Sequence, residues 1–142
     1  MKKILIALVA VTLVSCGTTG TRGTNTNVLY NVLSSQEFGG ASIRFYEILS
    51  EPNEIAMLQN DPKLQNKISN KDVQTSNFVV LNMGEKTSGG YSIGVDNVVE
   101  TDTNIVISVQ ETTPRPDSFV TQAFTNPFCV VKINSKKPII FK

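Results

Sequence analysis

The sequence contains no histidine and no tryptophan, and only two of its residues are cysteines. Without histidine, Ser–His–Asp and Cys–His nucleophile systems are excluded, as is any metal site built on imidazole. The sequence also lacks the run of about 18 apolar residues that a membrane-spanning helix requires, so no spanning helix is expected. These absences turn attention from catalysis towards binding or structural roles.

The sequence also lacks an excess of charge of either sign. The chain has 13 Lys and Arg residues against 12 Asp and Glu residues, and without Lys2 and Lys3 the balance becomes 11 against 12. No basic stripe is visible, so nucleic acid is not expected as a partner. With 142 residues, 40% of them hydrophobic, the chain is long enough for one domain with a packed core.

The first sixteen residues read as an export signal. Lys2 and Lys3 precede an apolar stretch of 11 residues, positions 4–14, which suits a signal peptide. The following Leu13-Val14-Ser15-Cys16 resembles the bacterial lipobox. That resemblance implies a lipoprotein signal peptide over 1–15, cleavage before Cys16, and acyl chains such as palmitate on Cys16 that attach the protein to a membrane. The alternative is an ordinary secretory signal in which Cys16 lies near the cleavage point.

Residues 16–27 are predicted to form a lipidated flexible tether. Gly17 to Asn27 is small and polar without periodicity, and a coil of this length spans about 18 Å. Position 17 lacks the aspartate that retains some lipoproteins in the inner membrane, so we expect the periplasmic face of the outer membrane of a bacterial cell envelope. With Cys16 acylated, Cys129 is a lone thiol, flanked by Phe128 and Val130, and we interpret it as an inert core residue.

Residues 28–142 are predicted to form a single β-rich domain. The fold class is α+β, mostly β: an antiparallel β meander that forms a sandwich or a partly open barrel, with one or two short helices. A helix is expected over 50–59, capped by Ser50, whereas 60–76 could be a second short helix or a loop. The first two strands are expected to pair as a hairpin, and a bulge is expected at Asp96-Asn97. The expected strands are 28–33, 42–49, 78–83, 91–99, 105–110, 128–133 and 138–141.

The stretch 84–91, GEKTSGGY, is the most distinctive in the chain. It is no phosphate-binding P-loop, because Glu85 precedes the lysine where glycine is required. A Ser88–Lys86 catalytic pair would need a buried, neutral lysine, whereas a glycine-rich loop leaves it exposed and protonated. No enzyme activity and no cofactor are therefore expected. No metal is expected either, because the acidic cluster of 96–104 lacks the pattern of a calcium loop.

Two interpretations of this stretch remain open. The loop could simply connect two strands, with Gly89-Gly90 adopting positive φ and Tyr91 beginning the next core face. Alternatively, it could be a recognition loop that presents a rigid turn to a protein partner. The candidate partner-binding residues are then Lys86, Thr87, Ser88, Gly89, Gly90 and Tyr91.

The second half of the chain carries several short motifs in a definite order. They are Val79-Val80-Leu81 followed by G-x-K-T-x-G-G-Y, then Glu111 and Pro114, then 122–128 before a valine-rich strand. Together they resemble the PrcB-type C-terminal domain family, and 77–142 is the expected family core. Thr87 stands where proline is expected in the family. The resemblance implies a non-enzymatic lipoprotein that binds a protein partner and stabilises a secreted or surface protease complex.

Two alternatives differ in mechanism. Thr87 to Tyr91 together with Arg115-Pro116 is similar to the T-x-G-Y and R-P motifs of chagasin-like protease inhibitors, which are immunoglobulin-like sandwiches. Such an inhibitor would block an active-site cleft with its loops. The other alternative is a structural envelope lipoprotein without a protease partner.

Overall fold

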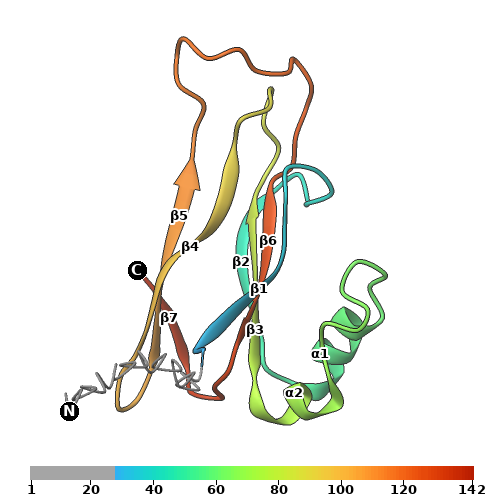
Figure 1. The fold of residues 1–142 in the computed structure, drawn as a ribbon, viewed down its shortest axis with the longest axis vertical. Coiled ribbons are helices and arrows are strands. Elements are labelled where there is room, and N and C mark those ends of the chain that lie inside the picture. The colour runs from blue at the N-terminus through green and yellow to red at the C-terminus, as the bar shows by residue number, and fades with distance from the viewer. Residues whose placement is uncertain (1–27) are drawn as a thin grey trace, which may run out of the picture.

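The computed structural model describes residues 28–142. The predicted signal peptide, Cys16 and the tether lie outside the described residues. The described part has seven strands and two short helices, and Figure 1 shows how they are arranged. They are β1 (Tyr30–Gln36), β2 (Arg44–Leu49), α1 (Pro52–Gln59), α2 (Asn70–Thr75), β3 (Asn77–Met83), β4 (Ser92–Glu100), β5 (Ile105–Thr112), β6 (Phe128–Ile133) and β7 (Ile139–Phe141).

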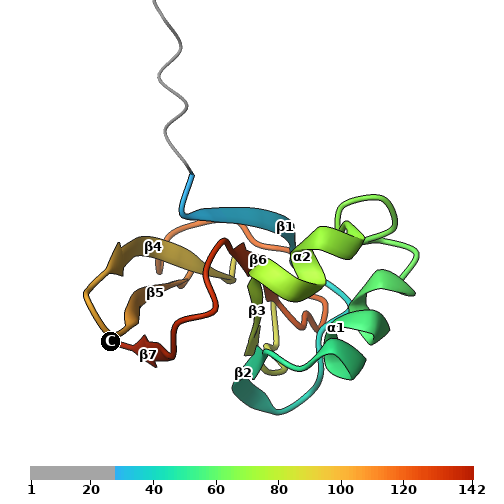
Figure 2. The ribbon, with the colours of Figure 1, turned by 90° about the horizontal axis from the view of Figure 1, so that it is seen from below.

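The strands form two sheets rather than a closed barrel over residues 28–142. One sheet has the order β1-β6-β3-β2 and is antiparallel throughout, and the other has the order β4-β5-β7. The two helices lie on the face of the four-stranded sheet that is turned away from the second sheet, as Figure 2 shows. The predicted class, mostly β with two packed sheets and short helices, is confirmed.

The position of β3 in the fold explains why its sequence is apolar at almost every position. Val79 and Leu81 are fully buried in the core between the two sheets. Phe78 and Val80 point to the opposite face, where they pack in the cluster that includes Ile55 of α1. Successive side chains of a strand point to opposite faces, so a strand covered on both faces needs apolar residues at odd and at even positions. Strand β3 is such a strand, and it lies between β6 and β2.

The strand order is less simple than a meander. The expected hairpin of the first two strands is wrong: β1 and β2 lie at opposite edges of the sheet, where β1 pairs with β6 and β2 with β3. The reason is that β3 and β6 carry the most continuous buried runs and therefore take the centre, which leaves the half-exposed strands for the edges. In addition, β7 pairs with β5 in parallel, so the C-terminal strand is not an antiparallel continuation.

Local predictions were mostly correct. Helix α1 begins after Glu51 rather than Ser50, because Glu54 accepts the backbone N–H groups of both residues. The open question at 60–76 is resolved as turns followed by α2. The bulge falls where expected, since the pairing of β4 with β5 shifts register between Val95 and Asn97.

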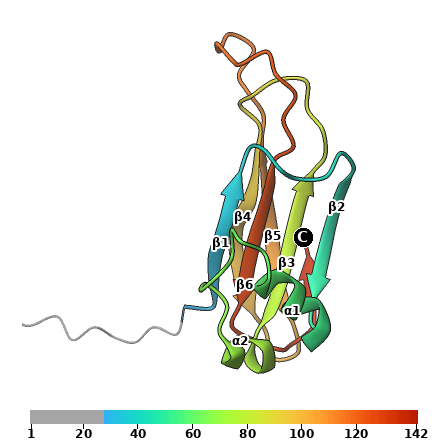
Figure 3. The same cartoon turned by 90° about the vertical axis from the view of Figure 1, so that its right-hand side faces the viewer.

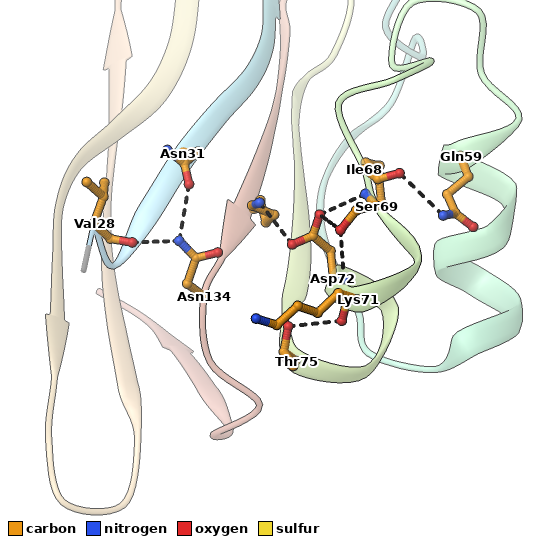
Figure 4. A network of polar contacts seen from close by, with 10 residues as sticks. Val28, Asn31, Gln59, Ile68, Ser69, Lys71, Asp72, Thr75 and Asn134 are labelled. Carbon is orange, nitrogen blue, oxygen red and sulfur yellow. Dashed lines mark hydrogen bonds and ion pairs between the residues drawn. The ribbon is translucent and has the colours of Figure 1, made fainter. Parts of the chain in front are cut away.

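Helix α2 is fastened to the sheet at its first turn. The carboxylate of Asp72 accepts the N–H and the hydroxyl of Ser69, both at 2.8 Å (Figure 4). It also forms an ion pair with Lys132 of β6 at 3.0 Å. Burial alone would raise the pKa of Asp72, but the bonds from Ser69 and Lys132 outweigh it and lower that pKa. A six-residue helix would be marginal alone, so these contacts matter to its position.

Candidate partner-binding site

Three loops meet at one end of the sandwich. They are residues 37–43 after β1, residues 84–91 after β3, and residues 113–127 after β5, and we call them the loop platform. Figures 1 and 3 show them together at the end opposite α1 and α2. Loops 84–91 and 113–127 each cross from one sheet to the other, so GEKTSGGY is not a hairpin turn.

Backbone hydrogen bonds tie 84–91 to 113–127. The N–H of Lys86 donates to the carbonyl of Thr125 at 2.8 Å, and the N–H of Thr125 donates to the carbonyl of Lys86 at 2.9 Å. Further along, the N–H of Gly89 donates to the carbonyl of Thr121 at 2.9 Å. Two loops outside the sheets thus share a short ladder that restricts both backbones.

A buried hydroxyl completes this junction. The side chain of Thr125 is fully buried, and its Oγ1 donates to the carbonyl of Ser88 at 2.8 Å. Removing the hydroxyl would leave that carbonyl without this donor, in a place where water has little access. Thr125 therefore holds the Lys86–Gly89 segment in place relative to the 113–127 loop.

The 37–43 loop joins the platform from the other side. The carboxylate of Glu37 accepts the N–H of Gly90 at 2.8 Å, while its backbone carbonyl accepts the N–H of Asn126 at 2.9 Å. At the base, the buried amide of Asn82 binds the carbonyl and N–H of Ala41. A Cβ on Gly40 would lie 2.2 Å from the Asn82 Oδ1, so only glycine allows this approach.

The six predicted partner-binding residues lie together on the platform but differ in accessibility. Thr87 and Gly90 are exposed, Lys86, Ser88 and Tyr91 are half-buried, and Gly89 is buried. Positive φ is found at Gly90 (+85°) but not at Gly89. The ammonium of Lys86 lies 5.8 Å from the centre of the Tyr91 ring, a cation–π contact along the loop. Their binding role stays a prediction.

The sequence reasoning missed the apolar side chains beside this loop. Phe119 is completely exposed, and Ile43, Phe124 and Phe38 are 71%, 66% and 52% exposed. All four belong to the 37–43 and 113–127 loops. The available signal was that each phenylalanine falls outside any alternating strand pattern, among polar and small residues.

Side chains near the platform also clamp the two sheets together. Arg44 of β2 forms an ion pair with Glu111 of β5 at 2.9 Å, and the hydroxyl of Tyr46 donates to the same carboxylate at 3.0 Å. Burial and that bond raise the pKa of Tyr46. The ring of Tyr46 packs on Phe141 of β7 with centroids 5.3 Å apart. The clamp holds β5, and with it the start of the 113–127 loop, in place.

Cys129 lies in the core between the sheets, 1% exposed, and burial raises its pKa to about 11. Over residues 28–142 no three potential metal ligands of the His, Cys, Asp or Glu type gather in one place. Glu100, at the acidic hairpin end, instead pairs with Lys137 at 2.9 Å. The helices of this same region are too short or too polar to cross a membrane.

Comparison with known proteins gives one match. A family model described as PrcB C-terminal matches residues 77–134, which run from the start of β3 to just beyond β6 and include two of the three platform loops. Neither the curated proteins nor the solved structures gave a significant match. Residues 77–134 of this chain therefore match the PrcB C-terminal family, as the resemblance over β3 and the GEKTSGGY loop indicated.

Proposed function

We propose that this protein is a lipid-anchored, non-enzymatic accessory protein that binds a protein partner through its loop platform, and that the partner is a secreted or surface protease. The family match over 77–134 supports an accessory role in a protease complex. The observation that carries the binding role is the contrast within the platform. Its backbone is held by hydrogen bonds among three loops, while four large apolar side chains point into solvent.

Such a surface suits a folded protein better than a small ligand. Exposed aromatic residues on a restricted backbone lose little conformational entropy on binding, and they supply the central contacts of many interfaces. Phe119 and Phe124 would form the centre of the contact. Lys86 and Thr87 would contribute polar contacts at its rim.

The position of the platform supports an orientation as well. The described chain starts at Val28, at the end of the sandwich opposite the platform (Figure 1). There, the side chain of Asn134 donates to the carbonyl of Val28 and to Asn31 (Figure 4). A lipid on Cys16 would thus hold the opposite end towards the bilayer, and the platform would point away from the membrane.

Protease inhibition is a second candidate, favoured by one contact. A Cβ built on Gly90 would lie 3.0 Å from the Cβ of Pro114, so the GEKTSGGY loop lies against the segment that begins Pro114-Arg115-Pro116. Two loops that enter one active-site cleft have to lie side by side, as these two motifs do here, whereas a stabilising subunit has no such requirement.

The test is co-purification from the native cells in mild detergent, with partners identified by mass spectrometry. The wild type is compared with Lys86→Glu and Phe119→Ser, and with Val99→Ser as a matched control, since Val99 is also exposed but lies on β4 near the opposite end. We expect a secreted protease with the wild type and the control, and its loss with both platform variants.

The activity of the recovered protease separates the candidates. A stabilising subunit leaves the protease active and prolongs its lifetime, whereas an inhibitor abolishes peptide hydrolysis. Recovery of envelope proteins alone, or of equal amounts of protease with every variant, contradicts the proposal and favours a structural lipoprotein.

A further inference from the structure

A second surface lies away from the loop platform, between helix α1 and strand β2. Here a cavity of about 250 Å³ opens beside the edge of the four-stranded sheet. Figures 2 and 3 show α1 lying alongside β2 at this edge. We call this surface the α1–β2 groove; it is lined by Glu47, Leu49, Glu54, Met57, Leu58 and Val80.

The groove continues along the sheet. A second cavity of about 220 Å³ is also lined by Leu58 and Val80, and it extends past Phe45 to Phe128. The two cavities therefore adjoin each other on the helix-side face of β2 and β3, and the second one reaches Gly39, Gly40 and Ala41 of the loop platform. Met57, 74% exposed, stands at the rim of the groove. An apolar surface of this shape is a common docking site for an extended segment.

Strand β2 offers a backbone edge along the same groove. It ends the sheet order β1-β6-β3-β2, and no other strand of residues 28–142 pairs with its outer side. All six of its residues pair with β3 in an unbroken register, so the strand has no bulge. Sheet edges of this kind accept an added strand from a partner, with main-chain hydrogen bonds giving affinity and flanking pockets giving specificity.

The charge of the groove indicates what kind of strand it would accept. Glu47, Glu54 and Asp61 line the two cavities, and none of the three takes part in the ion pairs found among residues 28–142. One oxygen of Glu54 caps α1, and one of Asp61 accepts the N–H of Lys63. The ammonium of Lys63 lies over the Phe128 ring at the far end. The end formed by Glu47 and Glu54 is thus acidic without a lining cation.

We propose that the α1–β2 groove binds an extended segment of another protein that alternates apolar side chains with lysine or arginine. The segment adds to the β2 edge, its apolar side chains fill the floor above Val80 and Leu58, and a basic side chain meets Glu47 and Glu54. Lysine and arginine suit this place because their apolar stems can cover the floor while the charge reaches the carboxylates. The cavity beside Glu47 and Glu54 shares no lining residue with the loop platform, so the chain would hold two partners or two parts of one.

The probe for the test is a fluorescein-labelled nine-residue peptide of alternating valine and lysine, added to the full chain in detergent micelles. Fluorescence anisotropy measures affinity, and amide hydrogen exchange locates the contact. We expect saturable binding, new protection over 44–49, and weaker binding as salt rises. A peptide with glutamate in place of lysine should not bind.

Variants separate this groove from other surfaces. Glu47→Lys should weaken binding by about tenfold, because it reverses one charge of a close pair. Met57→Glu should weaken it by a similar factor through loss of the apolar rim. Asp102→Lys changes the same charge in the exposed turn after β4 and should leave affinity unchanged, and circular dichroism checks that each variant is folded.

Four results would overturn the inference. One is equal affinity of the wild type and a folded Glu47→Lys variant. Another is protection that appears on β4 or on the loop platform in place of β2. The third is no saturable binding up to about 1 mM peptide, and the fourth is a groove that is occupied by a second copy of the chain, which analytical ultracentrifugation would detect.

Discussion

Replacement of Gly90 by alanine tests the geometry of the loop platform most directly. Gly90 has φ +85°, and a side chain there would meet Pro114 at 3.0 Å and Val120 at 3.1 Å. An alanine in left-handed backbone costs about 1–2 kcal/mol, and the tight contacts add a few tenths more. Reduced freedom of the unfolded chain returns about 0.4–1 kcal/mol. We therefore expect a net loss of about 0.3–2 kcal/mol, or about 1–8 °C in Tm for a domain of this size.

Gly94→Ala is the matched control. Gly94 lies in β4, has no positive φ, and has no atom within 4 Å of a built Cβ. Alanine should be neutral there, or stabilising by about 0.5–1 kcal/mol, because it restricts the unfolded chain without strain. Urea denaturation and thermal melting of the full chain in mild detergent measure both variants under the same conditions.

Amide hydrogen exchange adds a local measurement to the global one. The N–H groups of Lys86, Gly89 and Gly90 are each hydrogen-bonded to another platform loop, so opening of the platform should speed their exchange before the sheets unfold. If Gly90→Ala matches the wild type in stability, in exchange and in partner recovery, the positive φ and the rigid platform are both wrong.

Three further predictions concern single side chains, one in the loop platform, one in helix α2 and one in the core. Thr125→Val should destabilise the protein by about 1–3 kcal/mol because the carbonyl of Ser88 loses its donor, whereas Thr125→Ser should keep most of the stability; equal urea midpoints for the two would contradict the role of the hydroxyl. The pKa of Asp72 in the folded state lies below its ordinary value of 3.8, so its ionised form stabilises the fold above about pH 4 and that contribution is lost as the pH falls through the lowered pKa. The stability gap between wild type and Asp72→Asn should accordingly be largest near neutral pH and shrink as the pH falls through the lowered pKa of Asp72, and thermal melts that show a constant gap would refute this. Finally, Cys129, with a pKa of about 11, should resist a thiol reagent at pH 8 until urea unfolds the chain, and rapid modification of the native protein would place it outside the core.

Periodicity was enough to place most elements of the domain. Strands β3 and β6 were located almost to the residue because continuous apolar runs have few alternatives in a β-rich chain. The bulge in β4 was visible as a break in alternation at Asp96-Asn97. Pairing was not visible, because it depends on which strands compete best for the buried centre, and that competition involves the whole sheet. The expected hairpin of β1 and β2 failed for this reason.

Of the candidate site, too, one part could be predicted from the sequence and another could not. The GEKTSGGY loop attracted attention by composition alone, and the family match over 77–134 includes it. Phe38 and Phe119 could not be recognised from the sequence, because a single aromatic residue in a polar stretch gives no periodic signal. Their exposure follows only from where the other loops lie.

The sequence by itself determined the class of the domain, the position of its strands and helix α1, and the glycine that turns the loop at Gly90, since these follow from local patterns of apolar, polar and flexible residues. Only the tertiary structure decided that three loops distant in sequence form one platform, that β2 is an edge strand beside an acidic groove, and that the platform and Val28 lie at opposite ends. Those relations arise from contacts between residues far apart in the chain, such as Lys86 with Thr125, and no local pattern encodes them.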